Sequence, residues 1–229
     1  IMSIFMSLLM AASMLTVLMS VQPTEEVSAA NDYGLADNIQ DGAILHCFDW
    51  KYNDIKAELQ NIAEAGFSAI QTSPAQVGGG SGVWWWLYQP LGFYVGNNDL
   101  GTKDELKALC AEADTYGIKV VVDVVANHLA GNHSNIQNDL KDGQYWHNES
   151  GGIDYSNRWQ ITHRDIGMPD INSENSYVQQ VVKNYLLELK SLGVDGIRWD
   201  AAKHISLPSE SCNFWPTVTE LSLIHISEP

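Results

Sequence analysis

Short apolar runs alternate with helical patterns along most of the chain, and this alternation is what most limits the folds available to it. Four runs have the length and the β-branched content of strands, at residues 43–48, 67–72, 118–125 and from 194 onwards. The run 118–125 is apolar almost throughout, as expected of a strand that is covered on both faces in a parallel sheet. The order strand, helix, strand therefore predicts an α/β fold with a parallel sheet.

Polar side chains follow several of these strands at their carboxyl ends, which is the arrangement found in a (β/α)₈ barrel. Such a barrel has eight strands and typically ~250 residues, whereas this sequence supplies about four strand–helix units. We therefore expect the N-terminal half of a barrel, built from residues 31–128 and 173–220. Residues 129–172 are polar, rich in Gly and Asn, and too long for an ordinary loop, so they are expected to form a small subdomain inserted after the third strand.

Capping signals predict where the first two helices begin and end. Asn53 is expected to be the N-cap of the first helix, and Gly66 to stop it. Thr102 and Glu105 match a capping box, in which a hydroxyl and a carboxylate each satisfy an orphan backbone donor. Gly117 is expected to end the helix that they open.

The two ends of the chain do not follow these patterns. Residues 1–30 combine an apolar stretch with the small-residue site Ser28-Ala29-Ala30, which predicts a signal peptide and a secreted protein. The usual basic segment is missing and the chain starts at Ile1, so we expect the start to be clipped. An uncleaved membrane anchor is the alternative, because ~18 apolar residues approach the length that spans a bilayer. Residues 221–229 are expected to be a spurious tail outside the fold, following a truncation near residue 220.

Charge and cysteine content exclude several classes of protein. The chain has 12 Lys and Arg against 28 Asp and Glu, a net charge of −16, which argues against nucleic-acid binding because phosphates are bound by clustered Lys and Arg. Excess carboxylates favour neutral or cationic ligands, or a hard metal ion. The odd number of cysteines, at Cys47, Cys110 and Cys212, argues against a disulfide scaffold, and the first two are expected to be small buried residues.

Two strands end in segments that can carry chemistry. The third runs from Asp123 into Asn127 and His128, and the fourth contains Arg198 and Asp200. Two residues apart on a strand, Arg198 and Asp200 point to the same face. A guanidinium beside a carboxylate orients it and favours its ionised form, which suits a nucleophile. Taken alone, the pair could equally be a structural ion pair beneath a loop.

These segments resemble motifs of glycoside hydrolase family 13, the α-amylase family. Residues 123–128 are similar to its D-x-x-x-N-H motif, residues 196–204 to its G-x-R-x-D-A-x-K-H motif, and residues 168–172 to the motif that closes its inserted subdomain. The likeness runs from about residue 42 to 220. Four further stretches resemble secreted bacterial α-amylases of the Bacillus subtilis type, at residues 71–74, 86–90, 100–102 and 158–162.

The resemblance implies that Asp200 is the nucleophile of a retaining glycosidase, with Arg198 holding it. It also implies that seven other residues contact the sugar. These are His128 at the cleavage point, Tyr88 stacked on the sugar ring, Gln89 at its border, Lys203 and His204 on the leaving-group side, and Trp84 and Trp85 as further sugar-binding residues. Packing is the alternative role for any one of the tryptophans.

A Ca²⁺ ion is implied in the same way, held between the inserted subdomain and the barrel. The matching ligands are the Asn127 side chain, the Thr162 carbonyl, the Asp170 carboxylate and the His204 carbonyl. All four are oxygen donors, as a hard cation requires. The sequence shows no His, Cys and Glu cluster with the spacing of a zinc site.

The expected function is endo-hydrolysis of α-1,4-glucans by a secreted, calcium-dependent enzyme that is monomeric at full length. Other activities of family 13, such as transglycosylation or glucosidase action on small oligosaccharides, are the first alternative, and a non-catalytic carbohydrate-binding relative is the second. The resemblance also implies a general-acid Glu and a third carboxylate on later strands, and no such motif occurs here. We therefore expect the chain by itself to be inactive, and its open sheet edges to favour aggregation.

Overall fold

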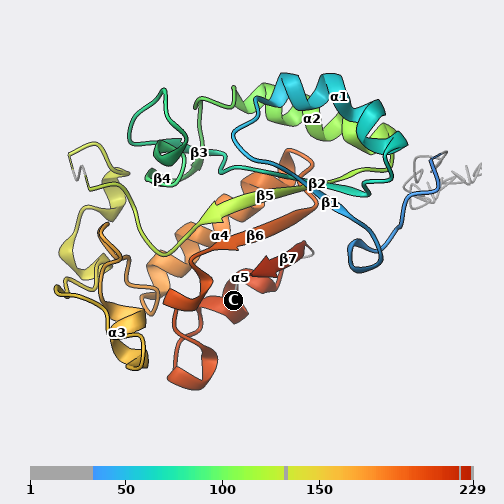
Figure 1. The fold of residues 1–229 in the computed structure, drawn as a ribbon. Helices are drawn as coiled ribbons and strands as arrows, with labels where there is room; N and C mark the ends of the chain where they lie inside the picture. The colour runs from blue at the N-terminus through green and yellow to red at the C-terminus, as the bar shows by residue number, and fades with distance from the viewer. Residues whose placement is uncertain (1–32, 132–133, 222, 228–229) are drawn as a thin grey trace, which may run out of the picture.

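The computed structural model describes residues 33–131, 134–221 and 223–227, so the predicted signal peptide lies outside the described residues. Its main sheet is parallel throughout, with the strand order β1-β2-β5-β6-β7. The first four strands are those predicted from the sequence (Figure 1). They are β1 (Ile44–Cys47), β2 (Ala69–Thr72), β5 (Lys119–Val125) and β6 (Gly196–Asp200).

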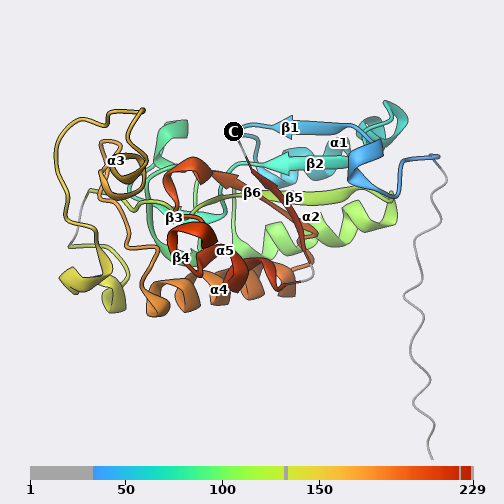
Figure 2. The same cartoon turned by 90° about the horizontal axis from the view of Figure 1, so that it is seen from below.

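A helix follows each of the first three strands of this series and packs with its apolar stripe towards the core. The helices are α1 (Tyr52–Glu64), α2 (Lys103–Thr115) and α4 (Ser176–Ser191). In α1, for example, Ile55, Leu59 and Ile62 recur at helical spacing and are buried. In Figure 2, α2 and α4 lie along the same side of the sheet, as the strand–helix alternation predicts. None of the described helices is long and apolar enough to cross a membrane.

The predicted helix ends are confirmed at three positions and wrong at one. The capping box of α2 is present, since Thr102 accepts a hydrogen bond from the Glu105 backbone and Glu105 accepts one from the Thr102 backbone. Gly66 and Gly117 follow α1 and α2 with positive φ angles. Asn53, however, is not the N-cap of α1: Lys51 is, and the Asn53 side chain donates to Glu105 instead. The Asn53 side chain therefore joins α1 to α2 instead of capping α1.

An antiparallel hairpin that the sequence analysis did not predict lies between β2 and α2. It pairs β3 (Gln76–Gly78) with β4 (Pro90–Val95), and the short 3-10 helix η2 (Trp84–Trp86) lies between them. The buried amide of Gln76 accepts from the Val125 backbone N–H and donates to the carbonyls of Val125 and Gly92. This amide fixes the hairpin to the carboxyl end of β5, where the polar residues of the third strand begin.

The inserted segment, residues 129–172, projects beyond the carboxyl ends of the strands (Figure 1). It contains the short helix α3 (Arg158–His163) and the 3-10 turns η3 (Asn138–Leu140) and η4 (Gly143–Tyr145). Its end returns to β5: the backbone of Asp170 pairs with that of His128, and Ile171 N–H donates to the Asn127 carbonyl. The chain therefore leaves and re-enters the barrel at one place.

The last described residues differ from the sequence-based expectation. Residues 224–227 form β7 (Ile224–Ser227), which pairs in parallel with β6, whereas residues 221–229 were expected to lie outside the fold. The chain between them carries η5 (Ala202–His204), η6 (Pro208–Glu210) and α5 (Phe214–Thr219). An open edge of a parallel sheet can pair with an extended segment, and β7 occupies this edge of β6.

The core is continuous between the sheet and the helices and includes the three cysteines. All are buried and free, as expected for Cys47 and Cys110, and burial raises the pKa of Cys47 to about 11 and of Cys110 to about 12. Buried thiols with such pKa values are poor nucleophiles. The cysteines therefore contribute to the packing of the core. The polar side chains that could act on a ligand lie at the carboxyl ends of the strands.

Candidate active site

The side chains of Arg198, Asp123 and Asp200 meet at the carboxyl ends of two adjacent strands. Asp123 on β5 is in register with Arg198 on β6, and Asp200 is two residues further along β6 on the same face. Nη1 of Arg198 lies 2.7 and 2.8 Å from the two carboxylate oxygens of Asp123 and 3.1 Å from Oδ1 of Asp200. The parallel register of the sheet thus places one guanidinium between two carboxylates.

These two carboxylates lie in different environments. Asp123 is fully buried, whereas the Asp200 side chain retains 20% of its accessible surface. Burial raises the pKa of Asp123 to about 7, and the charge and hydrogen bonds of Arg198 oppose this shift. Directly after Asp200, Ala201 has left-handed backbone angles (φ 51°, ψ 31°), a strained conformation for a residue with a Cβ. Asp200 is therefore the carboxylate exposed to a ligand, and it sits at a sharp turn.

Tyr88 and His128 extend this network towards the hairpin. The Tyr88 hydroxyl donates to Oδ2 of Asp123 at 2.9 Å, and Nε2 of His128 lies 3.1 Å from the Tyr88 carbonyl oxygen. His128 is almost completely buried, and this burial lowers its pKa, although the hydrogen bond to Tyr88 opposes the shift. A neutral imidazole at this position can donate or accept a hydrogen bond to a sugar hydroxyl.

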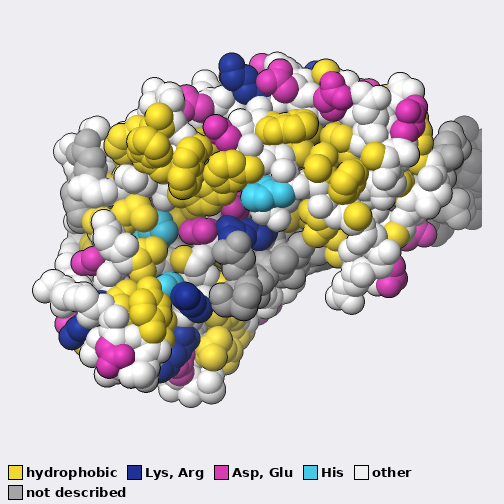
Figure 3. Space-filling view, viewed as in Figure 1, with side chains coloured by type: hydrophobic (Ala, Val, Ile, Leu, Met, Phe, Trp, Pro, Cys, Tyr) yellow, Lys and Arg dark blue, Asp and Glu magenta, His cyan; other side chains and the backbone are white. Residues whose placement is uncertain are grey.

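A cavity of about 370 Å³ opens at this point, and aromatic side chains form its rim. Phe48 lies 5.4 Å from Trp84 and 6.2 Å from Tyr88 between ring centroids, and Trp84 is 47% exposed. Figure 3 shows hydrophobic side chains gathered over the region of η2 and β4, beside exposed histidine, acidic and basic side chains. The described residues that line the cavity are His46, Phe48, Trp84, Tyr88, Asp123, His128, Ile166, Met168, Arg198 and Asp200.

The cavity brings together five of the residues predicted to bind or cleave the sugar: Tyr88, Trp84, His128, Arg198 and Asp200. The other four are not among the residues that line it. Trp85 is exposed beside Trp84, and Gln89 uses its carbonyl to accept from the Gly79 backbone. Nζ of Lys203 lies over the Tyr155 ring, 5.1 Å from its centroid, and Nδ1 of His204 is 2.8 Å from the Ile161 carbonyl.

The residues implied as calcium ligands come from the two sides of the junction between barrel and inserted segment. The backbone pairing of His128 with Asp170 places the side chains of Asn127 and Asp170 close to that junction. On the other side, the His204 ring and the Ile161 carbonyl join η5 to α3, the helix that contains Thr162. Nδ2 of Asn127 and Oδ1 of Asp170 are buried and have no hydrogen-bond partner.

An oxygen-binding cation fits these orphaned atoms. The two ends of a side-chain amide are nearly isosteric, so the position of Asn127 Nδ2 can equally present an oxygen. Thr162 lies in the last turn of α3, where backbone carbonyls have no helical partner. Buried polar atoms without partners are costly, and a bound ion would satisfy them.

Several cavity residues were not assigned roles from the sequence. Asp123 stands in the motif at the end of the third strand. A charged residue inside an apolar strand requires a buried partner, and this pattern in the sequence could have identified Asp123 as a site residue. His46 is a polar residue within the apolar run of β1, and it is exposed. Phe48, Ile166 and Met168 carry no such signal, because single apolar residues in loops are common.

Comparisons with known proteins agree with this geometry. The family described as "Alpha amylase, catalytic domain" matches residues 51–221. An α-amylase of Clostridium acetobutylicum is 42% identical over 80% of this chain and 26% of its own length. An α-amylase of Butyrivibrio fibrisolvens is 37% identical over 84% of this chain and 22% of its own. The chain thus spans about a quarter of the length of these relatives.

Solved structures show the same fold. An α-amylase from Geobacillus thermoleovorans, complexed with acarbose, has a TM-score of 0.71 and 24% identity over 84% of this chain and 47% of that one. An α-amylase from Malbranchea cinnamomea has a TM-score of 0.72 and 21% identity over 84% of this chain and 48% of its own. The chain belongs to the α-amylase catalytic domain family, glycoside hydrolase family 13. Its described part has the fold of the N-terminal half of a (β/α)₈ barrel, as predicted.

The buried ion cluster generates a prediction about stability. Replacing Arg198 by Leu leaves Asp123 buried without its counter-charge and facing Asp200. Breaking a buried pair in this way costs about 3–5 kcal/mol of unfolding free energy. The measurement is urea unfolding followed by tryptophan fluorescence.

The matched control is Lys103→Met, which removes the cation from the more exposed pair with Glu188. Exposed pairs contribute about 0–1 kcal/mol. Equal losses in the two variants would contradict the central position that we assign to Arg198.

Proposed function

We propose that this chain carries the nucleophile and the sugar-binding rim of an enzyme that hydrolyses α-1,4-glucosidic bonds with retention of configuration. The observation that supports this most directly is the Asp200 carboxylate, held by Arg198 in a cavity with an aromatic rim. Membership of a family of glycoside hydrolases supports the reaction class. The relatives named α-amylase support an α-glucan as the substrate.

In this proposal a glucose ring enters the cavity with its apolar face against Tyr88. The hydrogen bond from the Tyr88 hydroxyl to Asp123 fixes the orientation of the ring on which the sugar stacks. His128, neutral and buried, bonds a hydroxyl of the same sugar. The Asp200 carboxylate then attacks the anomeric carbon, and the bond to the departing glycosidic oxygen breaks as the covalent glycosyl-enzyme forms.

Arg198 has two functions in this step. Its guanidinium orients the Asp200 carboxylate through the contact between Nη1 and Oδ1, and its hydrogen bonds to Asp123 hold the guanidinium in place when a substrate binds. A non-catalytic carbohydrate-binding relative would not need this arrangement. The geometry therefore favours catalysis over binding alone.

Retaining hydrolysis also needs a carboxylic acid about 5–5.5 Å from the nucleophile to protonate the leaving oxygen. Among the described residues, Asp123 and Asp200 are the carboxylates that line the cavity, and Asp123 is bound to Arg198 and Tyr88. We propose that neither of them is the general acid. The 229 residues alone are therefore expected not to cleave starch.

We further propose that Ca²⁺ binds at the junction of the barrel and the inserted segment. Asn127 and Asp170 would supply side-chain oxygens, and Thr162 and His204 backbone carbonyls. The orphaned atoms of Asn127 and Asp170 support this assignment. When bound, the ion would supply electrostatic attraction that holds the inserted segment against β5.

Secretion is proposed from the pattern of residues 1–30 and a monomeric state from the resemblance alone. The free, buried cysteines show that the fold does not depend on disulfides, whatever the redox state of the compartment.

The nucleophile can be tested on this chain with maltosyl α-fluoride. Fluoride leaves without protonation, so attack by Asp200 breaks the C–F bond and forms an ester without help from a general acid. The missing acid would also be the base of the second step, so the ester should accumulate. Mass spectrometry of peptides is expected to find one maltosyl group on Asp200.

Asp200→Asn is expected to abolish this adduct, and Asp165→Asn, which changes a carboxylate outside the cavity lining, to preserve it. Starch incubated with the unmodified chain is expected to release no reducing sugar. An adduct on another residue would refute Asp200 as the nucleophile, and starch cleavage would refute the absence of the acid.

The calcium site is tested by Asp170→Asn. This change removes the charge among the four proposed ligands and should weaken Ca²⁺ binding, measured by titration calorimetry, by about tenfold or more, since each 1.4 kcal/mol is tenfold. Asp165→Asn again serves as control, because Asp165 is a carboxylate of the same inserted segment. Equal affinity in both variants would place the ion elsewhere.

The secretion proposal is tested by expressing residues 1–229 in a Gram-positive host. The chain in the medium is expected to begin at Ala30 or Asn31, as read by N-terminal sequencing. An intact N-terminus on membrane-bound protein would instead indicate the anchor.

A further inference from the structure

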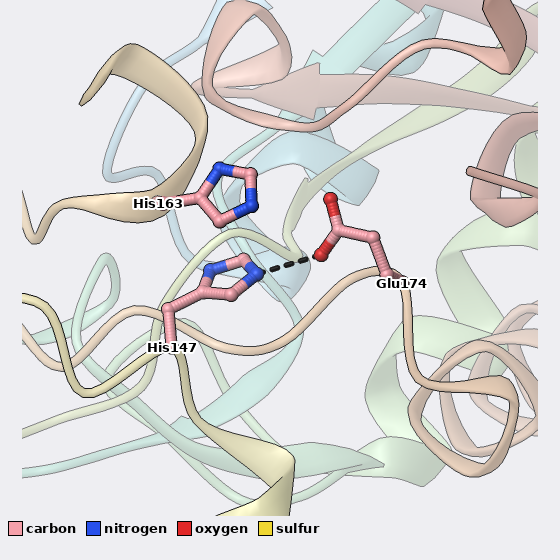
Figure 4. A group of neighbouring side chains, drawn as sticks. All are labelled: His147, His163 and Glu174. Carbon is pink, nitrogen blue, oxygen red and sulfur yellow. Dashed lines mark hydrogen bonds and ion pairs between the residues drawn. The ribbon is translucent and has the colours of Figure 1, made fainter. Parts of the chain in front are cut away.

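A second group of potential metal ligands lies in and beside the inserted segment. His147 follows η4, His163 is the last residue of α3, and Glu174 precedes α4. One ligand atom from each lies within 4.8 Å of those of the other two. Figure 4 shows both imidazole rings on one side of the Glu174 carboxylate, with a ring nitrogen of each directed towards it. The three side chains thus converge on one point from separate parts of the chain.

The hydrogen bonds around the two rings orient them for metal binding. Nδ1 of His147 lies 2.5 Å from Oδ2 of Asp170, and Nδ1 of His163 lies 3.1 Å from the Trp159 carbonyl. An oxygen acceptor at Nδ1 can hold the proton on that nitrogen, so that Nε2 is the nitrogen directed to a metal. In His147 a metal at Nε2 would replace the present contact with Oε2 of Glu174. Histidine ligands in metal sites almost always have such a carboxylate or carbonyl partner on the other nitrogen.

The group is also held in place before any ion arrives. The His163 ring stacks on Trp159, with centroids 5.0 Å apart, and its centroid is 4.5 Å from that of His147. Nε2 of His147 is 2.6 Å from Oε2 of Glu174, and the other carboxylate oxygen, Oε1, is buried without a hydrogen-bond partner. A buried carboxylate oxygen beside two imidazoles is a position that a cation can occupy.

We propose that His147, His163 and Glu174 bind a Zn²⁺ ion. Two imidazole nitrogens and one carboxylate oxygen are a donor set that suits zinc, with a fourth position left for water. Ca²⁺ would bind such a set poorly, because it takes six to eight oxygen ligands. This site is separate from the proposed calcium site and does not depend on the proposed function.

The simplest alternative is an ion pair in which a protonated His147 bridges Asp170 and Glu174. That arrangement explains both short contacts of His147. It gives no role to His163, whose ring is packed over His147 with Nδ1 already occupied. The two possibilities differ in whether His163 is needed for ion binding.

In the zinc-bound state the inserted segment would be attached to the start of α4 as well as to β5. Asp170 would then connect the two ions, through Oδ2 to His147 and through Oδ1 to calcium. The expected consequence is that zinc stabilises the inserted segment, in which the cavity residues Ile166 and Met168 lie.

The test uses the 229-residue chain without a histidine tag, in buffer saturated with Ca²⁺. Titration calorimetry is expected to show one equivalent of Zn²⁺ bound, and Co²⁺ is expected to give the intense visible absorption of a four-coordinate ion. His163→Gln should abolish both signals. His46→Gln, the same change at a histidine outside the group, should leave both unchanged.

Glu174→Gln provides a second variant if His163→Gln proves unstable, with folding checked by circular dichroism. No zinc binding by the unmodified chain would overturn the proposal. Equal zinc binding by His163→Gln and by the unmodified chain would also overturn it and favour the His147 ion pair.

Discussion

The guanidinium of Arg198, held between two carboxylates, is the interaction on which the rest of this site depends. One of these carboxylates, Asp123, has no solvent exposure, and its charge is compatible with the core only because Arg198 compensates it. The parallel register of β5 and β6 sets the distances, since Asp123 and Arg198 are direct partners. Asp200 is consequently presented at the strand end with its orientation already determined.

The inserted segment acts on this site from the other side of the cavity. Its last residues return to the end of β5, where the backbone of Asp170 pairs with that of His128, so the position of that imidazole depends on how the segment docks. The two proposed ions lie along this junction, one on hard oxygen donors and one on imidazoles. Their different chemistry would allow each to be removed without the other, because Ca²⁺ and Zn²⁺ prefer different ligands.

The sequence predicted the elements whose patterns are local. The four parallel strands and the capping box of α2 follow from apolar periodicity and from residue types that satisfy nearby backbone groups. The hairpin of β3 and β4 was missed because β3 is only three residues long and its attachment depends on Gln76, whose partner Val125 is 49 residues away. Sequence spacing carries no signal for such a contact.

The same distinction holds within the site. Asp200, Arg198 and His128 stand in motifs at strand ends, so their convergence could be predicted from the fold. Lys203 and His204 follow Asp200 in the same motif, and after the strained turn at Ala201 they form η5, where they contact Tyr155 and Ile161. Sequence spacing does not predict these two contacts. The group of His147, His163 and Glu174 has no zinc-like spacing and becomes visible only in three dimensions.

The central claim is that Asp200 faces the anomeric carbon of a bound α-glucan. A crystal structure of the chain with acarbose tests this claim most directly. The account predicts a ring stacked on Tyr88, with its anomeric position about 3–3.5 Å from an Asp200 oxygen, the distance of a reactive arrangement. Acarbose bound away from the cavity, or an Asp200 carboxylate turned from the sugar towards the outer helices, would contradict it.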